Sequence, residues 1–171
     1  MAGLAEEIDD TLDAQKRRGG KYLTFSIGKE EYGINILKIK EIIGMLPITT
    51  VPQTPEFLKG VINLRGKVIP VIDLRLRFGM EAIPYTERTC IIVTEVEGED
   101  TILTGIVVDS VSEVLNIRGK EIEDTPTFGT NMNTEYILGV AKMEDSVKIL
   151  LDINEVLSGE AIKNLEEAAD I

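Results

Sequence analysis

Three aspartates in this chain of 171 residues stand where a carboxylate could do chemistry. Asp73, Asp109 and Asp152 each follow a strongly apolar run, and a carboxylate in such a place can act as a general acid, a general base or a nucleophile. A carboxylate-dependent enzyme is therefore one hypothesis. None of the three aspartates is surrounded by the lysine, tyrosine or glycine-loop chemistry expected of a catalytic site, which weakens the enzyme hypothesis.

The chain contains no histidine and one cysteine, Cys90. The absence of histidine excludes Ser-His-Asp and Cys-His nucleophile activation and every histidine-containing zinc site. No EF-hand loop, P-loop or G-x-G-x-x-G motif occurs, and the apolar neighbours of Cys90 indicate an inert thiol. We therefore predict a protein without catalytic residues, metal or cofactor.

A second kind of candidate is the segment Asn63-Leu64-Arg65-Gly66, which interrupts two hydrophobic runs in GVINLRGKVIPVIDL (60–74). A polar tetrapeptide between two strands predicts a hairpin turn. Arg65 is then either a solvated turn residue or a group that a partner recognises.

The net charge of −12 limits the partners. A nucleic-acid-binding protein usually carries a basic surface, so this chain is predicted to bind neither nucleic acid nor an anionic membrane. No apolar run approaches the roughly 18 residues of a membrane span, and the acidic N-terminus does not resemble a signal peptide. These features predict a cytoplasmic protein without direct membrane insertion.

Hydrophobic patterning predicts a mainly β fold. After a polar segment at 1–20, which could form a short amphipathic helix, an opening hairpin covers 21–36. Helical turns are predicted at Pro55–Lys59 and Asp73–Phe78, and a C-terminal helix at 158–171. Further strands are predicted at Lys38–Met45, Gly60–Leu64, Lys67–Leu74, Thr89–Val96, Thr101–Asp109, Val111–Ile117, Tyr136–Met143 and Ser146–Ile153.

An internal repeat divides the chain. EYGINILKIKEII (31–43) aligns with LTGIVVDSVSEVL (103–115), with eight residues from glycine to glutamate in each. GVINLRGKVIPVIDL (60–74) aligns with GVAKMEDSVKILLDI (139–153), with 13 residues from glycine to aspartate in each. The same two blocks in the same order predict two copies of one β unit, at about 21–87 and 88–157.

The repeat separates scaffold from candidate function. Gly60 and Gly139 recur, which predicts bulges or close backbone approaches, and Asp73 and Asp152 recur as residues that bond backbone donors where strands end. Asn63, Leu64, Arg65 and Gly66 do not recur, since the second copy has Lys142-Met143-Glu144-Asp145.

KGVINLRGKVIPVIDLR, preceded by EYGINILKIKEII and followed by GIVVDSVSEVL and TEYILGVAKM, resembles the CheW family of bacterial chemotaxis coupling proteins. The resemblance covers about 21–157. It implies two SH3-like five-stranded β-barrel subdomains that share a hydrophobic core, which agrees with the two copies found in the sequence.

The resemblance also implies a function without catalysis. A CheW-like adaptor couples the cytoplasmic signalling tip of transmembrane chemoreceptors to the regulatory domain of the histidine kinase CheA. The alternative within this resemblance is a CheW-like regulatory domain separated from a larger CheA-type or CheV-type protein.

Site residues follow from the resemblance, position by position. It implies receptor binding by Ile39, Glu41, Gly60 and Arg65, with an ion pair between Glu41 and Arg65. It implies kinase binding by a different face, for which Leu23, Ile36 and Val71 are candidates. For Ile39 and for these three residues, an ordinary core position is the alternative.

Overall fold

The computed structural model describes residues 18–97, 101–124 and 134–157. Within these ranges the chain forms eleven strands: β1 (Gly20–Ile27), β2 (Glu30–Asn35), β3 (Ile39–Gly44), β4 (Leu58–Leu64), β5 (Lys67–Asp73), β6 (Cys90–Glu97), β7 (Thr101–Val108), β8 (Ser110–Ile117), β9 (Ile122–Glu123), β10 (Ile137–Lys142) and β11 (Val147–Leu151). The α-helices are α2 (Leu74–Arg77) and α3 (Ile153–Val156), and the 3-10 helices are η1 (Ile36–Lys38), η2 (Gly119–Glu121) and η3 (Thr134–Tyr136).

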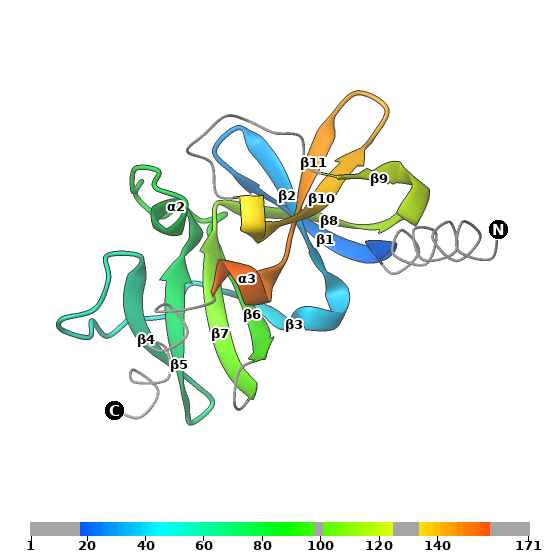
Figure 1. Ribbon diagram of the computed structural model, residues 1–171. Coiled ribbons are helices and arrows are strands. Elements are labelled where there is room, and N and C mark those ends of the chain that lie inside the picture. Colours follow the sequence, from blue (N-terminus) through cyan, green and yellow to red (C-terminus); the bar gives the residue numbers. More distant parts are fainter. Residues whose placement is uncertain (1–17, 98–100, 125–133, 158–171) are drawn as a thin grey trace.

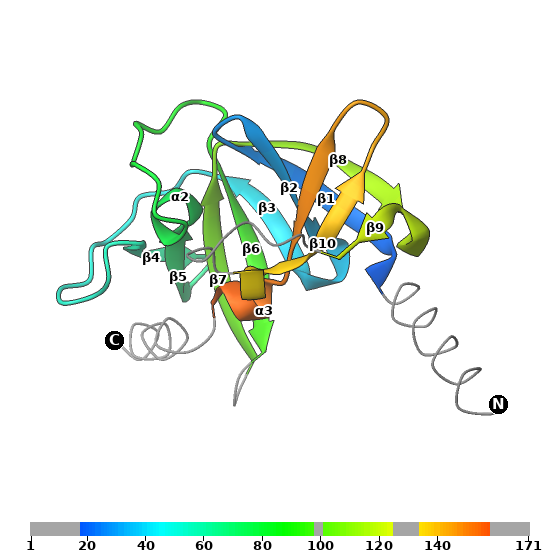
Figure 2. The ribbon, with the colours of Figure 1, turned by 45° about the horizontal axis from the view of Figure 1, so that its top comes forward.

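The strands form two sheets, which Figures 1 and 2 show side by side. The six-stranded sheet has the order β8-β1-β2-β11-β10-β9, and the five-stranded sheet has the order β3-β6-β7-β5-β4. The prediction of a mainly β fold with two SH3-like subdomains is confirmed.

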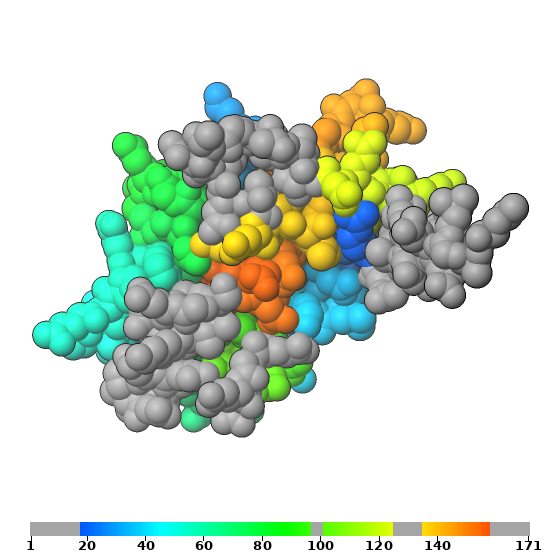
Figure 3. Space-filling model, in the orientation of Figure 1, coloured from blue at the N-terminus to red at the C-terminus, as the bar shows by residue number. Residues whose placement is uncertain are grey.

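The two halves of the sequence exchange strands between these sheets. The first half supplies β1 and β2 to one sheet and β3, β4 and β5 to the other, and the second half supplies the remaining strands of both. In the space-filling view, blue residues of the first half consequently lie against yellow residues of the second (Figure 3). The copies at 21–87 and 88–157 are therefore repeats in the sequence, and neither makes a sheet by itself.

Strand pairing relates the two copies by an approximate twofold symmetry. β5 pairs parallel to β7 with Val71 opposite Gly105, and β11 pairs parallel to β2 with Leu150 opposite Gly33. The repeat makes β1 equivalent to β6, β2 to β7, β3 to β8, β4 to β10 and β5 to β11. With these replacements, the order β3-β6-β7-β5-β4 becomes β8-β1-β2-β11-β10, which is the order of five strands in the other sheet. The internal repeat read from the sequence is thus a repeat of structure.

Arg77 lies where the two copies meet. Its guanidinium carbon is 5.1 Å from the ring centroid of Phe57 and 4.7 Å from that of Tyr136, two residues that stand three positions before Gly60 and Gly139. Arg77 Nε donates to the Val156 carbonyl at 2.9 Å, and Val156 is the repeat equivalent of Arg77. A residue that contacts its own equivalent marks the position of the symmetry axis.

One hydrophobic core spans both sheets. It includes Phe25 and Ile34 of the six-stranded sheet and Ile72, Ile92 and Ile106 of the five-stranded sheet, all 0% exposed. Each fully buried side chain of this size contributes roughly 1.5–3 kcal/mol. The shared core is therefore confirmed, and it holds the two subdomains together.

The predicted strands lie within two residues of the observed ones, while β9 was not predicted. The helical turn at Asp73–Phe78 is confirmed as α2. Pro55–Lys59 contains one hydrogen-bonded turn, in which the Leu58 N–H donates to the Pro55 carbonyl at 3.1 Å, and β4 begins at Leu58. The predicted helices at 1–20 and 158–171 lie outside the described residues, apart from the start of β1. Among the described residues, no helix has the length and apolarity to cross a bilayer.

Both glycines predicted to mark bulges do so. The register of β4 on β5 shifts between Leu58 and Gly60, and that of β10 on β11 shifts between Ile137 and Gly139. Gly60 has φ +143°, and a Cβ built there would lie 2.0 Å from the carbonyl oxygen of Thr49. The approach arises because Thr49 and Val61 exchange backbone hydrogen bonds of 2.9 Å.

We predict that Gly60→Ala lowers the free energy of unfolding by about 3 kcal/mol or more, because the methyl group meets backbone in a strained conformation. Gly44→Ala is the matched control, since a Cβ at Gly44 has no neighbour within 4 Å and its φ is not strained. Urea denaturation measures both variants. Equal stability of the two would contradict the close approach.

Candidate functional site

The segment Asn63-Leu64-Arg65-Gly66 forms the turn of the β4–β5 hairpin, as predicted. Leu64 pairs with Lys67, so Arg65 and Gly66 are the two loop residues. Their φ angles are +51° and +89°, the pattern of a type I′ turn, and the Gly66 N–H donates to Asn63 Oδ1 at 2.8 Å. Type I′ turns favour asparagine, aspartate or glycine at the first loop position. Arginine there is unfavourable for the turn itself.

Arg65 pairs with Glu41 of β3, which confirms the predicted ion pair. The Arg65 side chain is 70% exposed and that of Glu41 31% exposed. A pair so exposed contributes only about 0–1 kcal/mol to stability. Its main effect is to hold the guanidinium over β3.

The ion pair borders a hollow of about 430 Å³ on the five-stranded sheet. Apolar side chains and basic side chains both line it: Leu64, Ile69, Val93 and Leu103, with Lys40, Arg65 and Lys67. Lys40 pairs with Glu95 at 2.9 Å. Leu64, Ile69 and Val93 are at most 8% exposed, so the hollow has a buried apolar floor with basic side chains at its border, in a protein whose net charge is −12.

The second copy lacks this arrangement. The repeat equivalents of Glu41 and Arg65 are Glu113 and Glu144, two carboxylates that cannot form an ion pair. The equivalents of the apolar Leu103 and Ile69 are Glu31 and Lys148, which form an ion pair in which the Lys148 side chain is only 9% exposed. The site around Arg65 therefore exists once, on the five-stranded sheet.

The other predicted receptor-binding residues lie on β3 and β4, the two outer strands in the order of the five-stranded sheet, and differ in exposure. Ile39 is half-buried and packs on the main core from β3. Gly60 is buried against Thr49 and has no side chain to offer. Gly60 acts on the hairpin through the path of β4.

The three predicted kinase-binding residues are not on one surface. Leu23 is 2% exposed and Val71 0% exposed, and each belongs to a core cluster. Their side chains are unavailable to a partner because they are buried in these clusters, so a partner would sense them only through the strands they support. Ile36 is half-buried in η1, and its contact with the kinase stays a prediction.

Leu37 is a candidate that the sequence analysis missed. It follows Ile36 in η1 and is 84% exposed, the most exposed of the large hydrophobic side chains described. It borders a groove of about 420 Å³ between the two sheets, with Leu138, Glu95 and Asn154 among the other lining residues. The signal available in the sequence was the repeat, since Leu37 stands four residues after Gly33 as Asp109 stands four after Gly105.

All three aspartates considered for catalysis have structural partners. Asp73 caps α2 by accepting from the Arg75 N–H at 2.9 Å, and also accepts from the Tyr85 hydroxyl at 3.0 Å. Asp152 caps α3 by accepting from the backbone N–H groups of Asn154 and Glu155. The capping roles predicted for Asp73 and Asp152 are confirmed.

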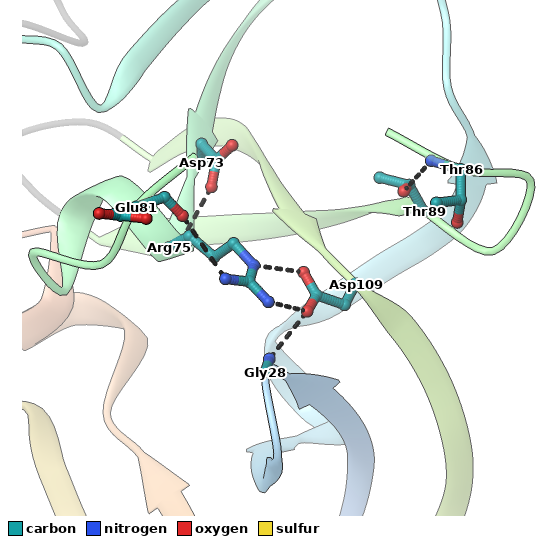
Figure 4. Close-up of polar contacts among 7 residues, drawn as sticks. All are labelled: Gly28, Asp73, Arg75, Glu81, Thr86, Thr89 and Asp109. Atoms are coloured by element: carbon teal, nitrogen blue, oxygen red, sulfur yellow. Dashed lines mark hydrogen bonds and ion pairs between the residues drawn. The ribbon is translucent and has the colours of Figure 1, made fainter. Parts of the chain in front are cut away.

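Asp109 binds Arg75 through two parallel hydrogen bonds, 2.9 Å from Nε and 2.7 Å from Nη2 (Figure 4). The Gly28 N–H donates to the same carboxylate at 2.8 Å. The hydrogen bond from Arg75 is the main reason that the pKa of Asp109 lies below its usual value of 3.8. A carboxylate held ionised in this way is poorly suited to act as a general acid near neutral pH.

Residues 18–97, 101–124 and 134–157 contain no group of three or more Cys, Asp or Glu residues placed to hold a metal ion.

Comparison with known proteins agrees with the geometry. The family model described as a CheW-like domain matches residues 21–161. The chain belongs to the CheW family. The chemotaxis protein CheW of Klebsiella aerogenes is 41% identical over 169 residues, which cover 99% of this chain and 98% of that protein. The chemotaxis protein CheW of Rhizobium meliloti is 34% identical over 142 residues, which cover 83% of this chain and 90% of that protein.

A solved structure shows the same fold. The crystal structure of the scaffolding protein TtCheW from Thermoanaerobacter tengcongensis superposes with a TM-score of 0.74 and 36% sequence identity. The match covers 84% of this chain and 95% of that one. The fold described above is thus that of the CheW family.

The turn at Arg65 yields a prediction about stability. In a Glu41→Gln background, where the ion pair is already absent, we expect Arg65→Asn to raise the free energy of unfolding by about 0.5 kcal/mol, because asparagine tolerates positive φ. Urea denaturation measures the change. Arg65→Lys in the same background is the control and should give no gain, and a loss of stability with asparagine would show that Arg65 supports the fold.

The Arg75–Asp109 pair yields a prediction about pH. At pH 7 we expect Asp109→Asn to lower the free energy of unfolding by about 2 kcal/mol, since charged hydrogen bonds are lost. The pKa of Asp109 is lowered in the folded state, so its stabilisation is complete above the unfolded pKa and disappears as the pH falls through the folded pKa. The stability difference between wild type and variant should therefore shrink below about pH 4. Asp145→Asn, in an exposed turn, is the control, and a difference independent of pH would refute the assignment.

Proposed function

We propose that this chain is a non-catalytic adaptor that couples chemoreceptors to the histidine kinase CheA. The observation that carries the proposal is the state of Arg65. It occupies a backbone conformation that favours other residues, its side chain is 70% exposed, and Glu41 holds that side chain in place. Where local sequence preference and structure disagree, a functional demand is the usual reason.

Two neighbouring surfaces support a receptor contact. The hollow beside Arg65 and the groove beside Leu37 both border β3 or η1, and both combine apolar side chains with charged ones. An amphipathic helix is recognised by such a surface, because its apolar stripe needs a hydrophobic groove and its polar flanks need charged partners. The signalling tip of a chemoreceptor is a helical hairpin, so this face fits the receptor.

The kinase contact then belongs to another surface, since an adaptor must hold both partners at once. Ile36 is the predicted kinase-binding residue with exposed surface, while Leu23 and Val71 support the strands from inside. Signal transfer in such an assembly requires contacts that differ between two states of the complex. The cytoplasmic location of the chain, close to membrane receptors, follows from these partners and is part of the proposal.

We predict that Arg65→Glu weakens binding to a receptor cytoplasmic fragment by roughly tenfold or more, because it removes a central cation and repels Glu41. Binding to the CheA regulatory domain and the melting temperature should stay nearly unchanged. Calorimetric titration of each partner into the purified chain measures both affinities.

Arg88→Glu is the matched control, because it makes the same charge change on an exposed loop outside the hollow. It should leave both affinities unchanged. Absence of binding by the wild-type chain to either partner would refute the adaptor function. If Arg65→Glu lowered the affinity for both partners equally, the substitution would be acting on the fold in general.

A further inference from the structure

The chain passes directly from one sheet to the other at two repeat-equivalent junctions. At the first, β2 of the six-stranded sheet leads through η1 to β3 of the five-stranded sheet. At the second, β7 of the five-stranded sheet leads through Asp109 alone to β8 of the six-stranded sheet. Leu37 and Asp109 are equivalent positions, and so are Asn154 and Arg75, each 15 residues after the bulge glycine of its copy.

The junction at Asp109 is closed by polar contacts. Its carboxylate accepts two N–H groups of Arg75, from the helix after β5, and one N–H of Gly28, from the turn between β1 and β2. Arg75 Nη1 also reaches the Glu81 carbonyl at 3.5 Å (Figure 4). The side chains of Arg75 and Asp109 are only 15% and 24% exposed. One carboxylate thus joins elements of both sheets.

The junction at Leu37 borders a groove and lacks the equivalent of the charged pair. Leucine stands there in place of the aspartate, asparagine in place of the arginine, and the groove of about 420 Å³ lies between the sheets. The two junctions therefore differ by a pair of charged residues, although strand order and register around them are equivalent.

We propose that the Arg75–Asp109 pair is a clamp that fixes the relative orientation of the two sheets and so sets the width of the open groove at Leu37. The shared core holds the sheets together mainly through buried area, which is a non-directional contribution. A bidentate arginine–carboxylate pair is directional, since the guanidinium fork and the carboxylate must be coplanar and aligned.

The clamp is a property of the chain by itself. Its consequence for binding rests on the proposed function: the groove walls are held at the separation that an inserted helix requires, and Arg75 and Asp109 act as positioning residues without touching the partner. Loss of the clamp should widen the range of groove widths and lower the fraction of molecules ready to bind.

The test measures distances between paired nitroxide labels by pulsed electron paramagnetic resonance, in a Cys90→Ser background. Lys67→Cys with Lys120→Cys reports across the two sheets, and Lys67→Cys with Gly44→Cys, at opposite ends of the strands, reports within the five-stranded sheet. All three labelled positions are exposed. Arg75→Lys is the informative variant, because it keeps a cation beside Asp109 and removes the fork. We expect the distance distribution across the sheets to broaden by roughly twofold, with the distribution within one sheet unchanged.

Lys142→Gln is the matched control, because it breaks an ion pair within one sheet. Lys142 of β10 lies 2.7 Å from Glu123 of the neighbouring strand β9. It should broaden neither distribution. An unchanged distribution across the sheets in folded Arg75→Lys overturns the clamp, and so does equal broadening within and across sheets. Titration of a receptor cytoplasmic fragment is the second readout, in which Arg75→Lys should weaken binding. Failure of the wild-type chain to bind that fragment refutes the adaptor function and leaves the distance result for the clamp intact.

Discussion

The parallel pairing of β5 with β7 and of β11 with β2 is the constraint on which the rest of this structure depends. Each pairing joins a strand of one sequence copy to a strand of the other. Because both copies contribute to both sheets, neither sheet can form without the complete pair of repeats. The large core that spans the sheets, the cation between Phe57 and Tyr136, and the two junctions all follow from this exchange.

Because the two copies share one scaffold, the features that differ between them are candidates for function. Helix caps, bulges and strand register recur in both copies, so they are explained by the fold. Two of the differences between the copies concern charge. One copy has Glu41 with Arg65 and an apolar hollow, where the other has two glutamates and the Glu31–Lys148 pair. One junction has Arg75 with Asp109, where the other has an exposed leucine. The hollow at Arg65 and the groove at Leu37 thus each occur once in a nearly symmetric frame.

Much of this could be predicted from sequence, for identifiable reasons. Strands with alternating or continuous apolar residues between glycine and proline turns were located closely, and the aligned glycines and aspartates gave the repeat. The Glu41–Arg65 pair was predicted from family resemblance. The strand exchange was not predicted, because pairing partners far apart in sequence leave no local signal. The burial of Leu23 and Val71 depends on which face of each strand meets the core, which the exchange decides, and Leu37 is exposed in η1, where the chain crosses between the sheets.

Exchange of strands also has a consequence for how the protein is made. Tyr32 pairs with Ile149, so the six-stranded sheet cannot be completed until the ribosome has synthesised nearly all the described residues. During translation β1 and β2 remain without their neighbours β8 and β11, and they expose apolar side chains such as Phe25 and Ile34. Pairings so distant in sequence fold slowly, and exposed strand edges favour aggregation. The order of synthesis therefore makes the first hairpin the segment that most needs protection in the cell.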